Sequence, residues 1–263
     1  MPEERRYDAV VIGSGPGGEG AAMTLAKAGR RVALVERYFQ VGGGCTHWGT
    51  IPSKALRAAV QRLSAYRQDP LTERMGGPRR ASFQAMMRTA DKVIEQQVHL
   101  HAGFYERNDV DVLKGHARFV DPHTLEVEHL EGRKTLLRAD HIVLAVGSRP
   151  YRPPGIDFSN PAVRDADTIL QLEETPRHLI VYGAGVIGCE YATIFSNFGQ
   201  TQVYLVDYAE RIIPYEDDDV SDFISSNLTL DQIAARLDDR VASRIAGMCE
   251  VIRLQGKDRR LRK

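Results

Sequence analysis

Two short glycine-rich segments of this chain have a spacing suited to the pyrophosphate of a dinucleotide. They read GSGPGG at residues 13–18 and GAGVIG at residues 183–188. In such a segment the first glycine permits a tight turn, the second lets the backbone approach the pyrophosphate, and the third lets a helix pack closely on a strand. We therefore expect six glycines to form two nucleotide sites: Gly13, Gly15, Gly18, Gly183, Gly185 and Gly188. A chain that binds two dinucleotides usually passes electrons between them.

An acidic residue follows each glycine segment at the place where a ribose would lie. These residues are Glu36 and Asp207. The carboxylate of Glu36 can accept hydrogen bonds from both ribose hydroxyls, and a carboxylate at this position disfavours a 2′-phosphate. Asp207 therefore favours NAD, whereas Arg211, four residues further on, could pair with the phosphate of NADP. The sequence leaves the preference between the two nucleotides open.

The elements around both segments predict the fold class. Apolar runs lie at residues 7–12 and 178–182. Within the first, residues 9–12 lack polar alternation, which is typical of a parallel strand that is covered on both faces, and we expect residues 178–182 to form a buried strand as well. Each run leads through its glycines into a helical stretch, and a second apolar run then ends at the acid. The order of strand, turn, helix, strand and acid predicts an α/β protein with two Rossmann-like units.

A third segment could also carry chemistry. Residues 42–54 read GGGCTHWGTIPSK and precede a helix that we expect from Ala55 to about Arg67. Three consecutive glycines would let the backbone lie against a flat ligand. The chain has three widely spaced cysteines, Cys45, Cys189 and Cys249, which argues against a disulfide framework and against a zinc site. Its eight histidines show no spacing typical of metal ligands, so we expect no metal.

Together these motifs resemble the FAD-dependent pyridine nucleotide–disulphide oxidoreductases. The redox segment of that family reads GG-x-C-x4-C-x-P-x-K, but Thr50 stands here in place of the second cysteine. A single cysteine cannot form the intrachain disulfide that accepts electrons from the flavin. Further similarities lie at residues 103–108, 117–121, 147–151 and 182–192, so that the resemblance covers about residues 7–225.

The Gly-Gly-Gly-Cys-Thr-His-Trp-Gly-Thr version of the segment resembles the transhydrogenase branch of this family. That resemblance implies Si-specific exchange of hydride between NADPH and NAD through FAD. Two alternatives remain: an oxidoreductase similar to dihydrolipoamide dehydrogenase, and a truncated module that binds nucleotide without turnover. Thr50 argues against the first alternative, because it leaves Cys45 without a partner in the segment.

The resemblance also implies roles for particular residues. It assigns FAD to the first unit and the nicotinamide nucleotide to the second. Lys54 would lie near flavin N5, pair with Glu190 and stabilise the negative charge of the reduced flavin, which makes both residues candidates for catalysis. Further contacts to the flavin nucleotide are implied for Gly43, Gly44, Cys45, Ala117, Ala145 and Gly147.

The middle of the chain is expected to add a helix and a small antiparallel sheet. Residues 81–108 predict one long helix, and short strand-like runs follow at 110–120, 125–129, 136–138 and 141–145. We expect three domains: an FAD-binding domain at 1–150, a partial NAD(P)-binding domain at 151–225, and an atypical amphipathic and basic tail at 226–263. Within the tail, residues 229–248 predict an amphipathic helix.

Composition limits the possible partners. The chain carries 35 basic and 35 acidic residues, so no overall field attracts nucleic acid or a membrane surface. It has no window of 18 apolar residues and no signal peptide, which makes the cytoplasm the expected location. The second flavin-contacting segment and the homodimer interface domain of the family are not recognisable here. We therefore expect poor flavin retention and weak or absent turnover for this chain alone.

Overall fold

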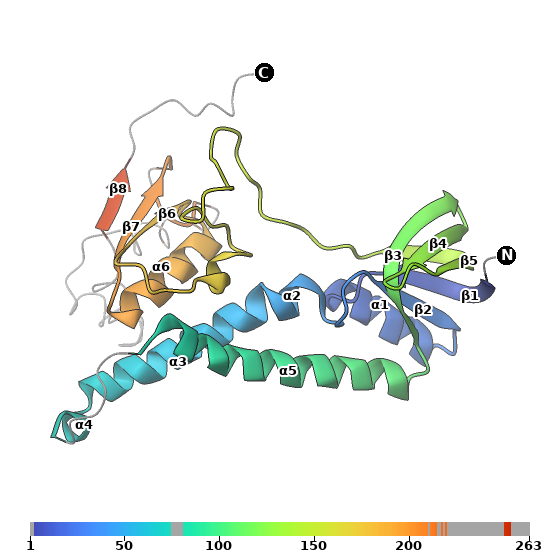
Figure 1. Ribbon diagram of the computed structural model, residues 1–263, viewed down its shortest axis with the longest axis horizontal. Helices are drawn as coiled ribbons and strands as arrows, with labels where there is room; N and C mark the ends of the chain where they lie inside the picture. The colour runs from blue at the N-terminus through green and yellow to red at the C-terminus, as the bar shows by residue number, and fades with distance from the viewer. Residues whose placement is uncertain are drawn as a thin grey trace. The chain divides into compact units, whose positions relative to one another are not determined.

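The computed structural model of the 263-residue chain describes residues 3–74, 81–209, 211–214, 217, 219 and 250–253. It is an α/β protein that divides into two compact units (Figure 1). The first comprises Met1–Lys54 and Arg88–Leu170, and the second comprises Ala55–Met87 and Gln171–Lys263. Compactness therefore places the division at residue 170 and groups residues 55–87 with the second unit, which differs from the expected boundary near residue 150.

Five strands form the sheet of the first unit: β1 (Glu3–Ile12), β2 (Val32–Glu36), β3 (Asp111–Asp121), β4 (Thr124–His129) and β5 (Lys134–Leu144). They close into a ring in which β5 pairs with β1. The contacts among β1, β2, β3 and β5 are parallel, whereas β3, β4 and β5 form the predicted antiparallel meander. The expectation of separate runs at 136–138 and 141–145 was wrong, because both belong to the single strand β5.

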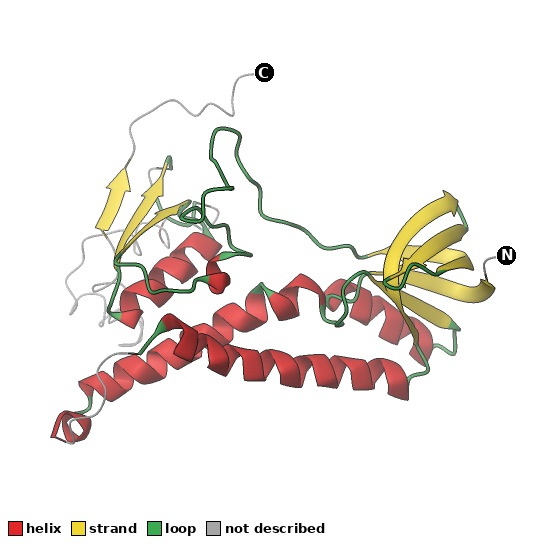
Figure 2. Cartoon of the chain, viewed as in Figure 1, coloured by secondary structure: helices red, strands yellow, loops and turns green. Residues whose placement is uncertain are grey.

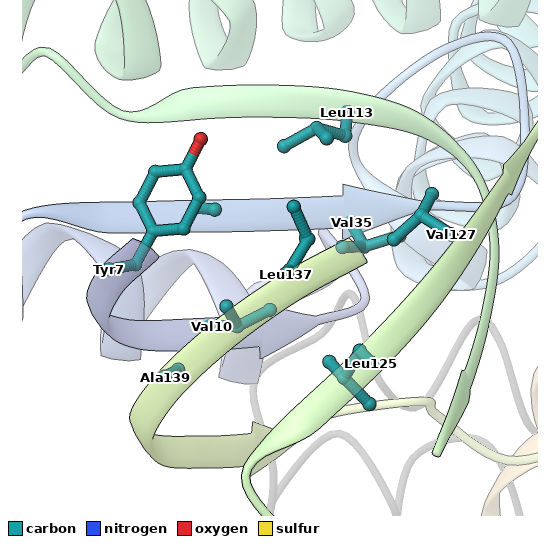
Figure 3. Close-up of a cluster of buried hydrophobic side chains, with 9 residues drawn as sticks. Tyr7, Val10, Val35, Leu113, Leu125, Val127, Leu137 and Ala139 are labelled. Atoms are coloured by element: carbon teal, nitrogen blue, oxygen red, sulfur yellow. The ribbon is translucent and has the colours of Figure 1, made fainter. Parts of the chain in front are cut away.

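One face of this sheet encloses an apolar core (Figure 3). The side chains of Val10, Leu125, Val127 and Leu137 have no exposed surface, and they come from the neighbouring strands β1, β4 and β5. Tyr7 is also buried, and its hydroxyl donates a hydrogen bond of 2.8 Å to the carboxylate of Asp111. The core is therefore apolar except where a buried polar group has a partner.

Helices cover the other face of the sheet. They are α1 (Pro16–Lys27) and the long helix α5 (Phe83–Arg107), which confirms the helix predicted at 81–108. Ala22 of α1 and Tyr105 of α5 pack in one cluster with Leu34 of β2. His101 of α5 lies against Glu19 of α1, with its Nδ1 next to a carboxylate oxygen. Because both faces of β2 are covered, all five of its residues are buried, as expected for a central parallel strand.

Three helices follow the first βαβ segment: α2 (Gly43–His47), α3 (Thr50–Gln68) and α4 (Pro70–Arg74). The expectation that the helix begins at Ala55 was wrong by five residues. Pro52 lies in the first turn of α3, where the backbone N–H groups have no intrahelical acceptor, so its missing N–H costs little.

The second unit has its own parallel sheet (Figure 2). Its strands are β6 (His178–Tyr182), β7 (Gln202–Asp207) and β8 (Glu250–Arg253), in the order β6-β7-β8. Helix α6 (Val186–Phe198) connects β6 to β7. The sequence did not predict β8, which lies within the expected tail. The helix expected at 229–248 and the basic residues 254–263 lie outside the described residues.

Residues 55–87 belong to the second unit through contacts with α6. The ring of Phe83 stacks on the ring of Phe195, with 5.5 Å between their centroids. The guanidinium of Arg67 donates a 2.6 Å hydrogen bond to the carbonyl of Phe198, at the carboxyl end of α6. Burial lowers the pKa of Arg67. A cation at this end of a helix also interacts favourably with the helix dipole.

In the described part of the chain, every helix is too short or too polar to cross a membrane. The same residues contain no group of three or more His, Cys, Asp or Glu side chains that could hold a metal ion.

Candidate functional site

The first glycine segment forms a tight junction between β1 and α1. Gly13 has a φ of +102°, a conformation that side chains rarely adopt, and its N–H donates a 2.8 Å hydrogen bond to Val35. A Cβ atom on Gly13 would overlap the carbonyl of Ala145, and one on Gly18 would overlap the carbonyl of Gly13. The structure thus brings Gly13, Gly18 and Ala145 together, and packing within the protein requires both glycines.

Gly15 differs from its neighbours, because the protein itself does not require a glycine there. Its φ is −68° and its ψ is 179°, which any residue can adopt. A Cβ atom on Gly15 would lie 4.0 Å from the Cα of Gly43, an ordinary contact, and one on Gly17 would meet nothing within 4 Å. Helix α1 begins at this point with no side-chain cap. The segment therefore presents open backbone and unpaired N–H groups, which fit a pyrophosphate.

The glycines at residues 42–44 pack against the first turn and against Trp48. Gly42 and Gly43 have φ values of +114° and +59°. A Cβ atom on Gly43 would lie 2.8 Å from the Cα of Gly15, and one on Gly44 would lie 2.8 Å from Nε1 of Trp48. Packing within the protein therefore favours glycine at these positions, which the sequence did not reveal. Trp48 itself is half-buried, and its ring meets the ring of Tyr38 edge-on, with 5.0 Å between their centroids.

Glu36 is buried and bonded to the turn that it follows. Only 4% of its surface is exposed. Its Oε2 accepts hydrogen bonds from the backbone N–H of Ser14 at 3.0 Å and from the hydroxyl of Ser14 at 2.5 Å, and its Oε1 accepts one from the N–H of Tyr38 at 3.0 Å. Both carboxyl oxygens of Glu36 are thus hydrogen-bonded within the protein itself.

Lys114 is a candidate site residue that the sequence reasoning missed. It is the partner of Glu36 in the parallel register of β2 and β3, and it is half-buried. Burial lowers its pKa, and the charge of Glu36 opposes that shift. A basic residue directly before Gly115, at the point where β3 leaves β2 for β4, is the signal that could have identified it.

The other predicted flavin contacts lie at different places in the first unit. Ala117 lies in the part of β3 that pairs with β4, where its partner is Val127. Gly147 follows β5 and has a φ of +74°. Cys45 is a half-buried free thiol within α2. Lys54 is exposed in the second turn of α3 and is the last residue of the first unit.

The second glycine segment repeats the geometry of the first. Gly183 has a φ of +117°, and its N–H donates a 2.8 Å hydrogen bond to Val206. A Cβ atom on Gly188 would overlap the carbonyl of Gly183. Gly185 has a φ of −73°, and a Cβ atom there would meet nothing within 4 Å in the described part of the chain. The prediction of two strand–turn–helix units is therefore confirmed. The expectation that residues 178–182 form a buried strand was wrong, because alternate residues of β6 are exposed, with Ile180 70% exposed.

Asp207 takes the place of Glu36 in this unit, and it accepts fewer hydrogen bonds from the residues that the structure describes. Its Oδ2 accepts the N–H of Ala184 at 2.5 Å, and its Oδ1 accepts the N–H of Ala209 at 2.7 Å. The thiol of Cys189 donates to the carbonyl of Ala184, and burial, followed by the charge of Asp207, raises the pKa of this thiol to about 11. Glu190 is half-buried in α6. Since Glu190 and Lys54 belong to different units, their pairing stays a prediction.

Comparison with known proteins identifies relatives over most of the chain. A family model described as pyridine nucleotide-disulphide oxidoreductase matches residues 7–261. The soluble pyridine nucleotide transhydrogenases of Salmonella paratyphi C and Salmonella choleraesuis are each 53% identical over 225 residues, which is 86% of this chain and 48% of theirs. The chain thus spans about half the length of these curated relatives, and the family match extends beyond residue 225, where we expected the resemblance to end.

Solved structures agree with this assignment. A Cu(II) complex of the HOCl-induced flavoprotein disulfide reductase RclA from Escherichia coli superposes with a TM-score of 0.73 at 29% identity, covering 95% of this chain and 49% of that one. Another structure of RclA gives a TM-score of 0.71 at 28% identity and covers 94% of this chain and 49% of its own.

Proposed function

The chain belongs to the pyridine nucleotide–disulphide oxidoreductase family. We propose that it functions as a transhydrogenase, which passes hydride between NADPH and NAD through FAD. FAD binds to the domain that we assign to residues 1–150, and the nicotinamide nucleotides bind to residues 151–225. The transfer is Si-specific, and the protein works in the cytoplasm. The relatives that are named soluble pyridine nucleotide transhydrogenases support the proposed reaction.

The observation that carries this proposal is the geometry of Gly15 and Gly185. Both residues have ordinary backbone angles, and among the described residues neither has a neighbour that would exclude a Cβ atom. Each begins a helix that lacks a side-chain cap. A bound pyrophosphate explains both glycines, because it must approach the backbone at the point where the helix presents its unpaired N–H groups. Two such places in one chain support two bound dinucleotides.

The residues of the chain have separate tasks in this proposal. The N-terminus of α1 and Glu36 hold the pyrophosphate and the ribose of FAD, and the half-buried ammonium of Lys114 offsets the negative charge beside Glu36. When it is bound, FAD supplies a ring that accepts a hydride at N5 and returns it. Lys54 holds a positive charge near that ring, and Glu190 orients the lysine. The protein thus contributes position and electrostatics.

A disulfide reductase similar to dihydrolipoamide dehydrogenase is the second candidate, since RclA is named a flavoprotein disulfide reductase. The cysteines of the described residues disfavour it. Cys45 and Cys189 are both free, and Thr50 opens α3 where the family places the second redox cysteine. The elevated pKa of Cys189 also leaves little thiolate at neutral pH.

A competition between substrates tests the proposed function. The purified chain, supplied with excess FAD, is mixed with NADPH and thio-NAD, and separately with dihydrolipoamide and NAD. We expect reduction of thio-NAD by NADPH and no oxidation of dihydrolipoamide. Oxidation of dihydrolipoamide without reduction of thio-NAD would favour the second candidate, and binding of FAD without either reaction would favour a nucleotide-binding module.

Asp207 offers a test of nucleotide preference. We expect Asp207→Asn to raise the affinity for NADPH relative to NADH about fivefold, because removing one charge near a 2′-phosphate relieves roughly 1 kcal/mol of repulsion. The affinity for NADH should fall, since an amide offers one oxygen to the two N–H groups of Ala184 and Ala209. Fluorescence titration with both nucleotides measures the ratio. Asp140→Asn, at an exposed carboxylate, is the control, and an unchanged ratio in Asp207→Asn would refute the assignment.

A further inference from the structure

We propose that Ser14 is a positioning residue that holds Glu36 in one orientation toward the adenosine ribose of FAD. The inference rests on the proposal that the first unit binds FAD. Ser14 occupies the second position of the glycine segment, a position to which the motif itself assigns no role. Its surface is 1% exposed, so its hydroxyl must find partners within the protein.

The hydroxyl of Ser14 joins three segments of the first unit. It donates a 2.5 Å hydrogen bond to Oε2 of Glu36 at the end of β2, and it accepts a 2.9 Å hydrogen bond from the N–H of Gly42. The backbone N–H of Ser14 donates to the same carboxylate oxygen at 3.0 Å. One buried side chain thus fixes the glycine turn, the acid and the segment at residues 42–44 relative to one another.

These bonds determine how many ribose contacts Glu36 can make. A carboxylate offers about four acceptor positions. Ser14 fills the two on Oε2, and the N–H of Tyr38 fills one on Oε1, at 3.0 Å. One position on Oε1 remains, so Glu36 accepts one ribose hydroxyl, whereas the sequence suggested both. Because the carboxylate is already oriented, binding does not have to order it.

The second unit provides a comparison within the same chain. Ala184 occupies the position of Ser14, and its N–H binds Oδ2 of Asp207 at 2.5 Å, but it has no hydroxyl. Asp207 accepts one other hydrogen bond, on Oδ1 from Ala209, among the described residues. Two acceptor positions are therefore left on Asp207. Among the described residues, the acid of the first unit is therefore held by more hydrogen bonds than the acid of the second unit.

The full chain with Ser14→Ala tests this role, with Thr135→Val as a matched control. Thr135 is also fully buried in the first unit, and its hydroxyl is hydrogen-bonded to His129. Each apoprotein is titrated with FAD, and the bound FAD is then displaced by ADP, 2′-deoxy-ADP and 3′-deoxy-ADP. We expect Ser14→Ala to weaken FAD binding about tenfold, the loss typical of a hydrogen bond to a charged group.

The deoxy analogues separate positioning from a general loosening of the fold. Wild type should bind ADP more tightly than the one analogue that lacks the contacted hydroxyl. The ratio of these two affinities should fall toward one in Ser14→Ala. Thr135→Val should keep both the affinity for FAD and the preference. If Ser14→Ala does not fold, Ser14→Gly removes the same hydroxyl and takes its place.

The possible results distinguish this inference from the function on which it rests. Wild-type affinity and preference in Ser14→Ala would overturn the inference alone, and so would weaker FAD binding with an unchanged preference. A wild-type chain that binds no FAD at any concentration would overturn the proposed function and the inference together.

Discussion

Replacing Gly15 by alanine is expected to weaken FAD binding by at least about 100-fold while the protein remains folded. The added methyl would occupy the space through which a pyrophosphate approaches the start of α1. It would also disrupt charge-assisted hydrogen bonds from the backbone. At about 2 kcal/mol each, within the usual range of ~1–3 kcal/mol, the two effects together come to ~4 kcal/mol, which is more than the ~2.7 kcal/mol of a 100-fold change. The apoprotein itself should be as stable as wild type or slightly more stable, because Gly15 has ordinary angles and alanine lowers the entropy of the unfolded chain.

Equilibrium titration with FAD and thermal unfolding of the apoprotein measure the two parts of this prediction. Gly20→Ala is the matched control, since Gly20 lies in the same helix and a Cβ atom there meets nothing within 4 Å. It should leave FAD binding unchanged. FAD affinity in Gly15→Ala that equals that of wild type would show that no pyrophosphate lies against this turn.

Replacing Lys54 by methionine is expected to slow reduction of the bound flavin by NADPH about 100-fold, the usual effect of losing one charge-stabilising donor. Methionine keeps most of the length of the side chain but removes the cation that favours negative charge on the reduced ring. FAD should still bind, because we expect Lys54 to contribute more to the reaction than to the affinity for FAD. Stopped-flow absorbance without oxygen measures the rate.

Two further variants make the Lys54 prediction specific. Lys27→Met removes an exposed cation in the last turn of α1. In this variant, NADPH should reduce the bound flavin at the wild-type rate. Glu190→Gln should slow reduction as well, and its effect should not add to that of Lys54→Met if the two residues act as a pair. Additive effects would argue against the predicted pairing, and a wild-type rate in Lys54→Met would remove its role in catalysis.

The repeated unit was predictable because its signals are local. Apolar runs, glycines and a terminal acid follow one another within about 30 residues, the length of such a unit. The structure has both turns, both helices and both acids where the sequence indicated them, as at Gly13 and Gly183, whose N–H groups make equivalent hydrogen bonds to Val35 and Val206.

Other features were not predictable because they depend on contacts between distant segments. The pattern within β3 does not show that Lys114 lies beside Glu36, which is a matter of register between strands. The bond from Gly42 to Ser14 joins residues 28 apart. Strand β5 looked interrupted because the polar residues Asp140 and His141 follow its buried first half, and both are exposed in the structure. Glycines at 43 and 44 concealed the short helix α2, since glycine is a poor helix former.

The central claim is that this chain holds FAD and exchanges hydride between two nicotinamide nucleotides. Visible absorbance of the purified chain with added FAD, recorded without oxygen, tests it most directly. We predict a protein-bound flavin band that bleaches when NADPH is added and returns when NAD follows. A chain that binds no FAD at any added concentration, or a bound flavin that NADPH does not bleach, would contradict the account.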